Sequence, residues 1–260
     1  MASETDALLE AGDDALRAAD WRTAAQSYRA AVELSEGGEA LFGLGIAEWW
    51  AGETREALRC WERAYTAFSR LPDRGQAAFT AVYLCLSYRM SLGNDAAARG
   101  WLERAASLVE EFDLKAMQGW VFLCRAYVAN DGGEPHTAEG HARDALAIAN
   151  GGGDADLALC ATSELGAALV EMGRLDEGVA LLDQAMAAAL AGEASDLDAV
   201  VLISCRTITS CARAADVKRA IQWIRAADDF NQRYGSAHLY TTCRVHQASV
   251  LFAVGEWERA

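Results

Sequence analysis

Residues 44–64, LGIAEWWAGETREALRCWERA, contain the pattern that decides the fold. A small residue, Gly52, stands where the apolar spacing breaks; Ala57 follows five residues later and Ala64 twelve residues later. The same arrangement returns about every forty residues along the chain. A repeat of this period is typical of stacked supersecondary units, in which each unit packs only on its neighbours.

The repeated small residues fall into three sets. Seven residues are about two helical turns, so positions five and twelve after each turn share one face of the following helix. That face is predicted to pack closely on neighbouring helices, because a side chain larger than methyl would push them apart. The turn positions are Ala19, Gly52, Gly93, Gly133, Gly173, Ala215 and Gly255. Those five residues later are Ala24, Ala57, Ala98, Ala138, Gly178, Ala220 and Ala260, and those twelve later are Ala31, Ala64, Ala105, Ala145, Ala185 and Ala227.

Each turn lies between two segments with helical periodicity. Apolar residues recur at steps of three and four in residues 39–50 before Gly52 and in residues 54–68 after it, which predicts amphipathic helices. The sequence lacks alternating β-branched runs and hairpin chemistry. We predict an all-α fold of about six and a half antiparallel helix pairs, in a single domain over residues 1–260. The chain stops just inside the second helix of a seventh unit, which we interpret as the end of a fragment of a longer protein.

The pattern resembles the tetratricopeptide (TPR) repeat. Leu44-Gly45 and Leu165-Gly166 carry this resemblance, because each glycine stands seven residues before a turn glycine and the later small residues follow. The units here are longer than the 34 residues of the standard repeat. The resemblance implies an α-α superhelix.

A second resemblance concerns residues 181–193, LLDQAMAAALAGE, with residues 205–211 and 243–246. These segments are similar to the helical-repeat region of actinobacterial LuxR-type transcriptional regulators. That implies a sensor or scaffold region normally followed by an output domain, although no helix-turn-helix with a basic recognition helix is visible in the sequence.

Composition excludes several classes of function. The chain has 38 acidic and 23 basic residues, a net charge of −15, which argues against direct nucleic-acid binding. The best apolar stretch, residues 157–170, is interrupted by Glu164 and is too short to span a bilayer. The start of the chain lacks the pattern of a signal peptide. The seven cysteines are odd in number and never spaced as CxxC, which indicates reduced, mostly buried thiols in a cytoplasmic protein.

The TPR resemblance implies a binding groove lined by the first helix of each pair. Carrying the usual groove spacing onto this chain gives an aromatic and nearly uncharged lining. The Lys-Asn-Lys-Arg clamp of chaperone-binding repeats is missing, so an apolar small ligand, an aromatic peptide or a helix of a protein partner fits better. The alternative is that the longer helices bury these aromatic residues between layers. The candidate binding residues are Phe42, Trp49, Tyr83, Met90, Trp120, Tyr127 and Arg213.

The main hypothesis is a non-catalytic scaffold or sensor region of a bacterial transcriptional regulator, without a cofactor. It rests on the absence of a GxSxG, Walker or GxGxxG motif and on the large surface that repetition generates. Two alternatives stay open. The unpaired last helix would leave residues 250–252 exposed and favour a homodimer. The other is a metal site built from Cys205, Cys211, Cys243 and His246.

Overall fold

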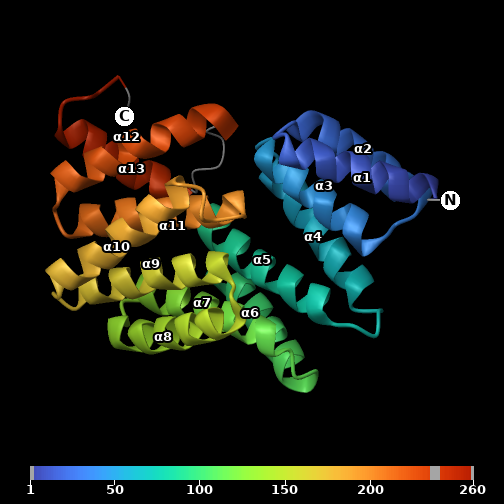
Figure 1. Cartoon of the computed structure of the whole chain (residues 1–260), viewed down its shortest axis with the longest axis horizontal. Coiled ribbons are helices and arrows are strands. Elements are labelled where there is room, and N and C mark those ends of the chain that lie inside the picture. The colour runs from blue at the N-terminus through green and yellow to red at the C-terminus, as the bar shows by residue number, and fades with distance from the viewer. Residues whose placement is uncertain (1–2, 235–240, 259–260) are drawn as a thin grey trace. The chain divides into compact units, whose positions relative to one another are not determined.

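The computed structural model describes residues 3–234 and 241–258, and these residues contain helices joined by short turns and no strand (Figure 1). The predicted all-α architecture of paired helices is confirmed. The helices of residues 1–114 are α1 (Glu4–Arg17), α2 (Trp21–Leu34), α3 (Gly38–Trp50), α4 (Thr54–Phe68), α5 (Gly75–Leu92) and α6 (Asp95–Glu111). Those of residues 115–260 are α7 (Lys115–Asp131), α8 (Pro135–Gly152), α9 (Ala155–Glu171), α10 (Leu175–Leu190), α11 (Leu197–Arg213), α12 (Val217–Tyr234) and α13 (Thr241–Ala253).

The chain divides into two compact units, Met1–Leu114 and Lys115–Ala260. In the first unit each helix packs on the next, which gives the pairs α1–α2, α3–α4 and α5–α6. In the second unit the pairs are α7–α8, α9–α10 and α11–α12, followed by α13 (Figure 1). There α7 also contacts α9, α9 contacts α11, and α11 contacts α13, so the first helices of successive pairs form one layer. One repeat domain over the whole chain stays a prediction.

All seven predicted turn positions have a left-handed backbone. Their φ angles lie between 56° at Ala19 and Ala215 and 90° at Gly52. A residue with positive φ ends a helix and redirects the chain, and glycine adopts it without the steric cost that a Cβ atom brings. The recurring small residue in the sequence is therefore the residue that reverses the chain within each pair.

The small residues after each turn are buried, as the packing argument requires. Ala57, Ala64 and Ala145 are fully inaccessible, and the other described members of both sets are buried as well. Ala260 lies outside the described residues. Gly166 in α9 and Gly178 in α10 approach each other closely. A Cβ atom at Gly178 would lie 2.6 Å from the carbonyl oxygen of Gly166, so the two backbones touch here.

Each unit has its own apolar core. In the first unit the largest inaccessible side chains include Tyr28 and Trp61, and in the second they include Leu182, Met186 and Ile203. The indole of Trp61 packs against Gly45, the first-helix glycine that carries the TPR resemblance. Among the helices of the described residues, none is long and apolar enough to cross a membrane.

We expect Gly178→Ala to lower the free energy of unfolding by about 1–3 kcal/mol, because the new methyl group must force the α9 and α10 backbones apart. Gly140→Ala is the matched control, since a Cβ atom at this position in α8 would meet nothing within 4 Å. The control should gain about 0.5–1 kcal/mol from helix propensity. Urea unfolding followed by circular dichroism measures both changes. Equal effects of the two substitutions would contradict the close approach.

Candidate functional site

In the first unit, two predicted binding residues lie together. Phe42 on α3 and Tyr83 on α5 make an edge-to-face contact with ring centroids 5.3 Å apart. Phe79, one turn before Tyr83, contacts both rings at 5.7 and 5.3 Å. All three side chains are half-buried. We call Phe42, Phe79 and Tyr83 the aromatic face; sequence reasoning missed Phe79.

The other two predicted residues of this unit lie beneath the surface. Trp49 is 4% exposed and Met90 is 3% exposed. The ring of Trp49 packs on Trp61, with centroids 5.9 Å apart. Trp49 and Met90 are therefore buried between helices, as the alternative in the sequence analysis expected. A partner could contact them directly only if these side chains moved.

In the second unit, Trp120 ties α7 to α9. Its indole N–H donates a 3.0 Å hydrogen bond to Oδ2 of Asp154. The other oxygen of Asp154 accepts from the backbone N–H of Leu157 at 3.0 Å, which caps the first turn of α9. Trp120 packs partly against the core cluster that includes Leu157. The indole N–H of Trp120 and its apolar ring surface therefore both have partners within the second unit.

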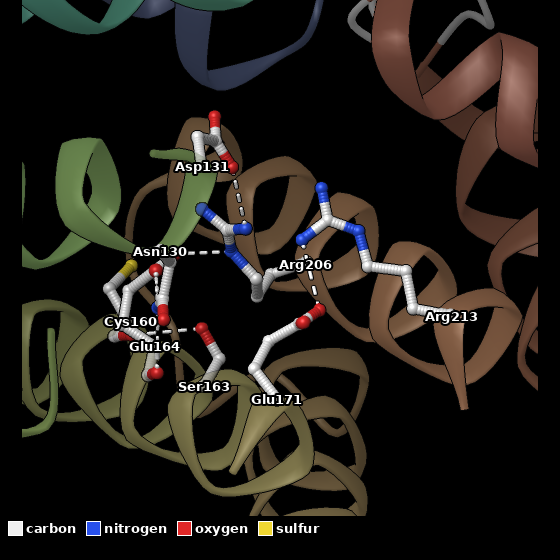
Figure 2. Close-up of polar contacts among 8 residues, drawn as sticks. All are labelled: Asn130, Asp131, Cys160, Ser163, Glu164, Glu171, Arg206 and Arg213. Carbon is white, nitrogen blue, oxygen red and sulfur yellow. Dashed lines mark hydrogen bonds and ion pairs between the residues drawn. The ribbon is translucent and has the colours of Figure 1, made fainter. Parts of the chain in front are cut away.

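A buried charge network lies where α7, α9 and α11 meet (Figure 2). Arg206 of α11 donates from Nε to Glu164 of α9 at 2.7 Å and from Nη1 to Asp131 of α7 at 3.0 Å. Asn130 of α7 donates to the other carboxylate oxygen of Glu164 at 2.8 Å. The side chains of Arg206 and Glu164 are 3% and 5% exposed. The guanidinium of Arg206 thus links α7, α9 and α11, the first helices of three successive pairs.

The electrostatics of this network are those of an ion pair removed from water. Burial raises the pKa of Glu164, and the charge of Arg206 opposes that shift. Burial acts to lower the pKa of Arg206, but Glu164 and its other neighbours outweigh it and raise the pKa overall. The guanidinium also lies over the ring of Tyr127, with its carbon 4.2 Å from the centroid. Arg206 is therefore charged and held from several sides.

A second ion pair lies nearer the surface. Arg213, two turns after Arg206 on α11, donates to Glu171 of α9 at 3.1 Å (Figure 2). Their side chains are 38% and 33% exposed, so both are accessible. The charges of this region also act on His246 of α13. Burial and the charge of Arg213 lower the pKa of His246, and the charge of Asp131 opposes that shift. We call Tyr127, Asp131, Glu171 and Arg213 the polar face, and Arg206 lies buried beneath it.

Two polar atoms of the network lack a partner. Asn130 Oδ1 and Arg206 Nη2 are buried and make no hydrogen bond. A buried polar atom left unpaired costs about 1–3 kcal/mol, and such atoms need an explanation where they occur.

The sequence predicted Tyr127 and Arg213 as binding residues but did not identify the charges beneath them. Glu164 was visible as the interruption of an apolar stretch, and Arg206 is the single charge between Asp198 and Arg213. A lone charge inside an otherwise uncharged helix is a signal for a buried pair, because it must find a partner. What the sequence lacks is the identity of that partner, 42 residues away.

One of the four ligands of the predicted metal site is not available to bind a metal. Cys205 is disulfide-bonded, so its sulfur is not a thiolate ligand, and the expectation of reduced thiols is wrong at this residue. Cys211 is a buried free thiol whose pKa burial raises to about 12. The side chain of Cys243 lies outside the described residues. Within the described part of the chain, no group of three or more metal-ligating side chains comes together.

No protein-family model matches the sequence, and no curated protein matches it. Solved structures do match the fold. The chain is similar to one in the APC/C hetero-tetramer Cut9–Hcn1, at 14% identity and a TM-score of 0.62, over 95% of this chain and 42% of that one. It is also similar to a Rap protein complexed with competence and sporulation factor, at 12% identity and a TM-score of 0.60, over 99% of this chain and 94% of that one.

A third similar structure is the Signal Transduction ATPase with Numerous Domains (STAND) protein with a tetratricopeptide repeat sensor from Pyrococcus horikoshii. The identity is 15% and the TM-score 0.54, over 91% of this chain and 42% of that one. The chain thus spans less than half the length of two of these structures. At these identities the comparisons establish the fold, and that fold is the TPR-type helical repeat.

The buried network yields a stability prediction. Arg206→Met leaves Glu164 buried without its cation, and we expect the free energy of unfolding to fall by about 3–5 kcal/mol near neutral pH. Burial already raises the pKa of Glu164 in the wild type, and removing the opposing charge of Arg206 raises it further. Because the folded-state pKa lies above the unfolded value, stability decreases as the pH rises through it, so the loss should be smaller at about pH 5.

Arg213→Met is the matched control, because its ion pair with Glu171 is accessible to solvent and worth about 0–1 kcal/mol. Removing both charges together, in Arg206→Met/Glu164→Leu, should recover part of the loss. Urea unfolding at the two pH values measures all four proteins. An Arg206→Met protein no less stable than Arg213→Met would disprove the role given to the network.

Proposed function

We propose that the chain is a partner-binding sensor or scaffold region, and that the second unit binds an extended segment of a protein partner on the polar face. The observation that carries the proposal is the bracing of this face by Arg206. One guanidinium fixes Asp131 through a 3.0 Å hydrogen bond and lies 4.2 Å from the ring centroid of Tyr127. Contact residues held from below lose little conformational entropy on binding.

The chemistry of the polar face suits a polypeptide. Tyr127 offers a half-buried ring, and Glu171 and Arg213 offer an accessible acceptor and donor. A peptide backbone presents N–H and C=O groups in alternation and pairs with both kinds. Tyr and Arg are also the residue types enriched among the strongest contacts of protein interfaces.

In the first unit the proposal assigns partner contact to Phe42 and Tyr83, the accessible part of the predicted groove. Trp49 and Met90 would support them from the interior. An apolar small ligand at this face remains the alternative, and it would have to insert among rings that already contact one another.

The cellular setting in this proposal is a cytoplasmic bacterial regulator of transcription. The resemblance of residues 181–193 to LuxR-type regulators supports it. So do two similar structures: the STAND protein carries a tetratricopeptide repeat sensor, and the Rap protein is complexed with competence and sporulation factor. The surface that would sense the signal is the polar face.

A display library of random peptides selected on the whole chain tests the binding role. We expect selected peptides to bind at least about tenfold more weakly to Arg213→Glu and to Tyr127→Ala than to the wild type, the loss typical of central interface residues. Arg143→Glu on α8 is the control of equal charge change, because its ion pair with Glu139 involves no residue of the polar face. Peptides that bind all variants equally, or a selection without enrichment, would refute the proposal.

Self-association is a second candidate, because apolar side chains are exposed around the end of α13. Phe252 is 67% exposed and Trp257 is 70% exposed, and their rings lie 6.3 Å apart. Val250 and Leu251, which the sequence predicted to be uncovered, are buried at 4% and 1% because α13 packs them against α11 and α12. Only Phe252 of the three fits the predicted dimer surface.

Sedimentation equilibrium measures this association. We expect a concentration-dependent dimer that Phe252→Ser/Trp257→Ser abolishes, since removing the apolar area removes the driving force. Leu34→Ser, at an exposed apolar position on α2, should leave the association unchanged. A wild-type protein that is monomeric at high concentration would exclude this candidate.

A further inference from the structure

A hollow of about 760 Å³ lies in the first unit. It is formed by the turn between α1 and α2, by α2 itself and by the end of α3. Its volume falls within the range of small-molecule sites, about 300–1,000 Å³. Its lining residues are Ala19, Asp20, Trp21, Arg22, Thr23, Ala25, Gln26, Arg29, Glu48 and Ala51.

One wall of the hollow is aromatic and fixed. Trp21 lines it and stacks on Trp50, with ring centroids 5.0 Å apart and the planes inclined by 23°. Trp50 is 4% exposed, so it anchors the stack in the core, whereas Trp21 is half-buried. The hollow therefore has a flat apolar surface that does not need to be ordered when a ligand arrives.

The polar side of the hollow is a row of hydrogen-bond donors on α2. Arg22, Gln26 and Arg29 stand four and three residues apart, which places them on one face of the helix. All three are exposed and all three line the hollow. Arg29 is held in position by an ion pair with Glu48, whose side chain is only 8% exposed.

The acids of the hollow are already engaged. Both oxygens of Asp20 accept from Thr23, one from its backbone N–H at 3.1 Å and one from its hydroxyl at 2.7 Å. These hydrogen bonds lower the pKa of Asp20. Glu48 accepts from Arg29. Arg22 makes no hydrogen bond or ion pair with any residue in the described ranges, so its donors and the remaining ones of Arg29 are left to a ligand.

We propose that this hollow binds a small organic anion that joins a carboxylate or phosphate group to a flat ring. The anionic group is held by the guanidinium groups of Arg22 and Arg29, and the ring lies against Trp21. Guanidinium groups bind carboxylate and phosphate through paired, charge-assisted hydrogen bonds, which orient the anion as well as attract it. Gln26, between the two arginines, donates a further hydrogen bond.

The test uses the whole chain and four probes in calorimetric titrations: phenyl phosphate, phenylacetate, inorganic phosphate and benzyl alcohol. We expect one or both of the first two to bind saturably, because they combine charge and ring. Inorganic phosphate lacks the ring and benzyl alcohol lacks the charge, so each should bind at least about tenfold more weakly. The stronger of the first two identifies the anionic group.

Arg22→Gln should lower the affinity for the probe that binds by at least about tenfold, because one charge-assisted hydrogen-bonded pair is lost. Its folding is expected to be intact, since Arg22 is exposed and unpaired within the described residues. Arg55→Gln, an exposed arginine on α4 outside the lining, is the control of equal charge change and should bind as the wild type does. Arg213→Glu, at the polar face, should also bind normally, which separates this site from the proposed partner site.

Two results would overturn the proposal. One is the absence of saturable binding of phenyl phosphate and phenylacetate to the wild type at millimolar concentration. The other is binding that Arg22→Gln and Arg55→Gln leave equally unchanged, because the arginine row would then have no part in it.

Discussion

The fold depends on how closely paired helices approach one another. At Gly166 and Gly178 the backbones of α9 and α10 are in contact, and in every pair the residues five and twelve positions after the turn are alanine or glycine and, where described, buried. This spacing brings successive first helices into one layer. Because α7, α9 and α11 lie in that layer, side chains from residues 34 to 75 positions apart in the sequence meet at one place.

The repeat made the fold predictable from a single sequence. The seven turn residues, their left-handed backbone and the buried face of the second helices all follow from the small-residue pattern. The exposure of the first helices did not follow. Most residues of α3 and α5 are buried, so the amphipathic face predicted for residues 39–50 is not seen in α3. For this reason Trp49 and Met90 could not be told apart from Phe42 and Tyr83.

The buried network was beyond sequence reasoning for a different reason. Glu164 and Arg206 are separated by 42 residues, and Asp131 and Arg206 by 75. Asp131 and Glu171 each stand two residues before a turn glycine, and only the packed layer decides which of the two meets Arg206. The first helices of the two units carry different chemistry, aromatic around Phe42 and Tyr83 and charged around Arg206. A shared scaffold therefore does not fix what each unit binds.

The buried guanidinium also bears on how such a chain folds correctly. Repeated units resemble one another, and a helix that docks beside the wrong neighbour satisfies most of the small-residue contacts just as well. Arg206 would lose its partners in such a misdocked stack, because Asp131 and Asn130 come from α7 and Glu164 comes from α9. An out-of-order stack would bury a cation without its carboxylates, at a cost of several kcal/mol. This polar cluster therefore favours the observed order of α7, α9 and α11 within the second unit.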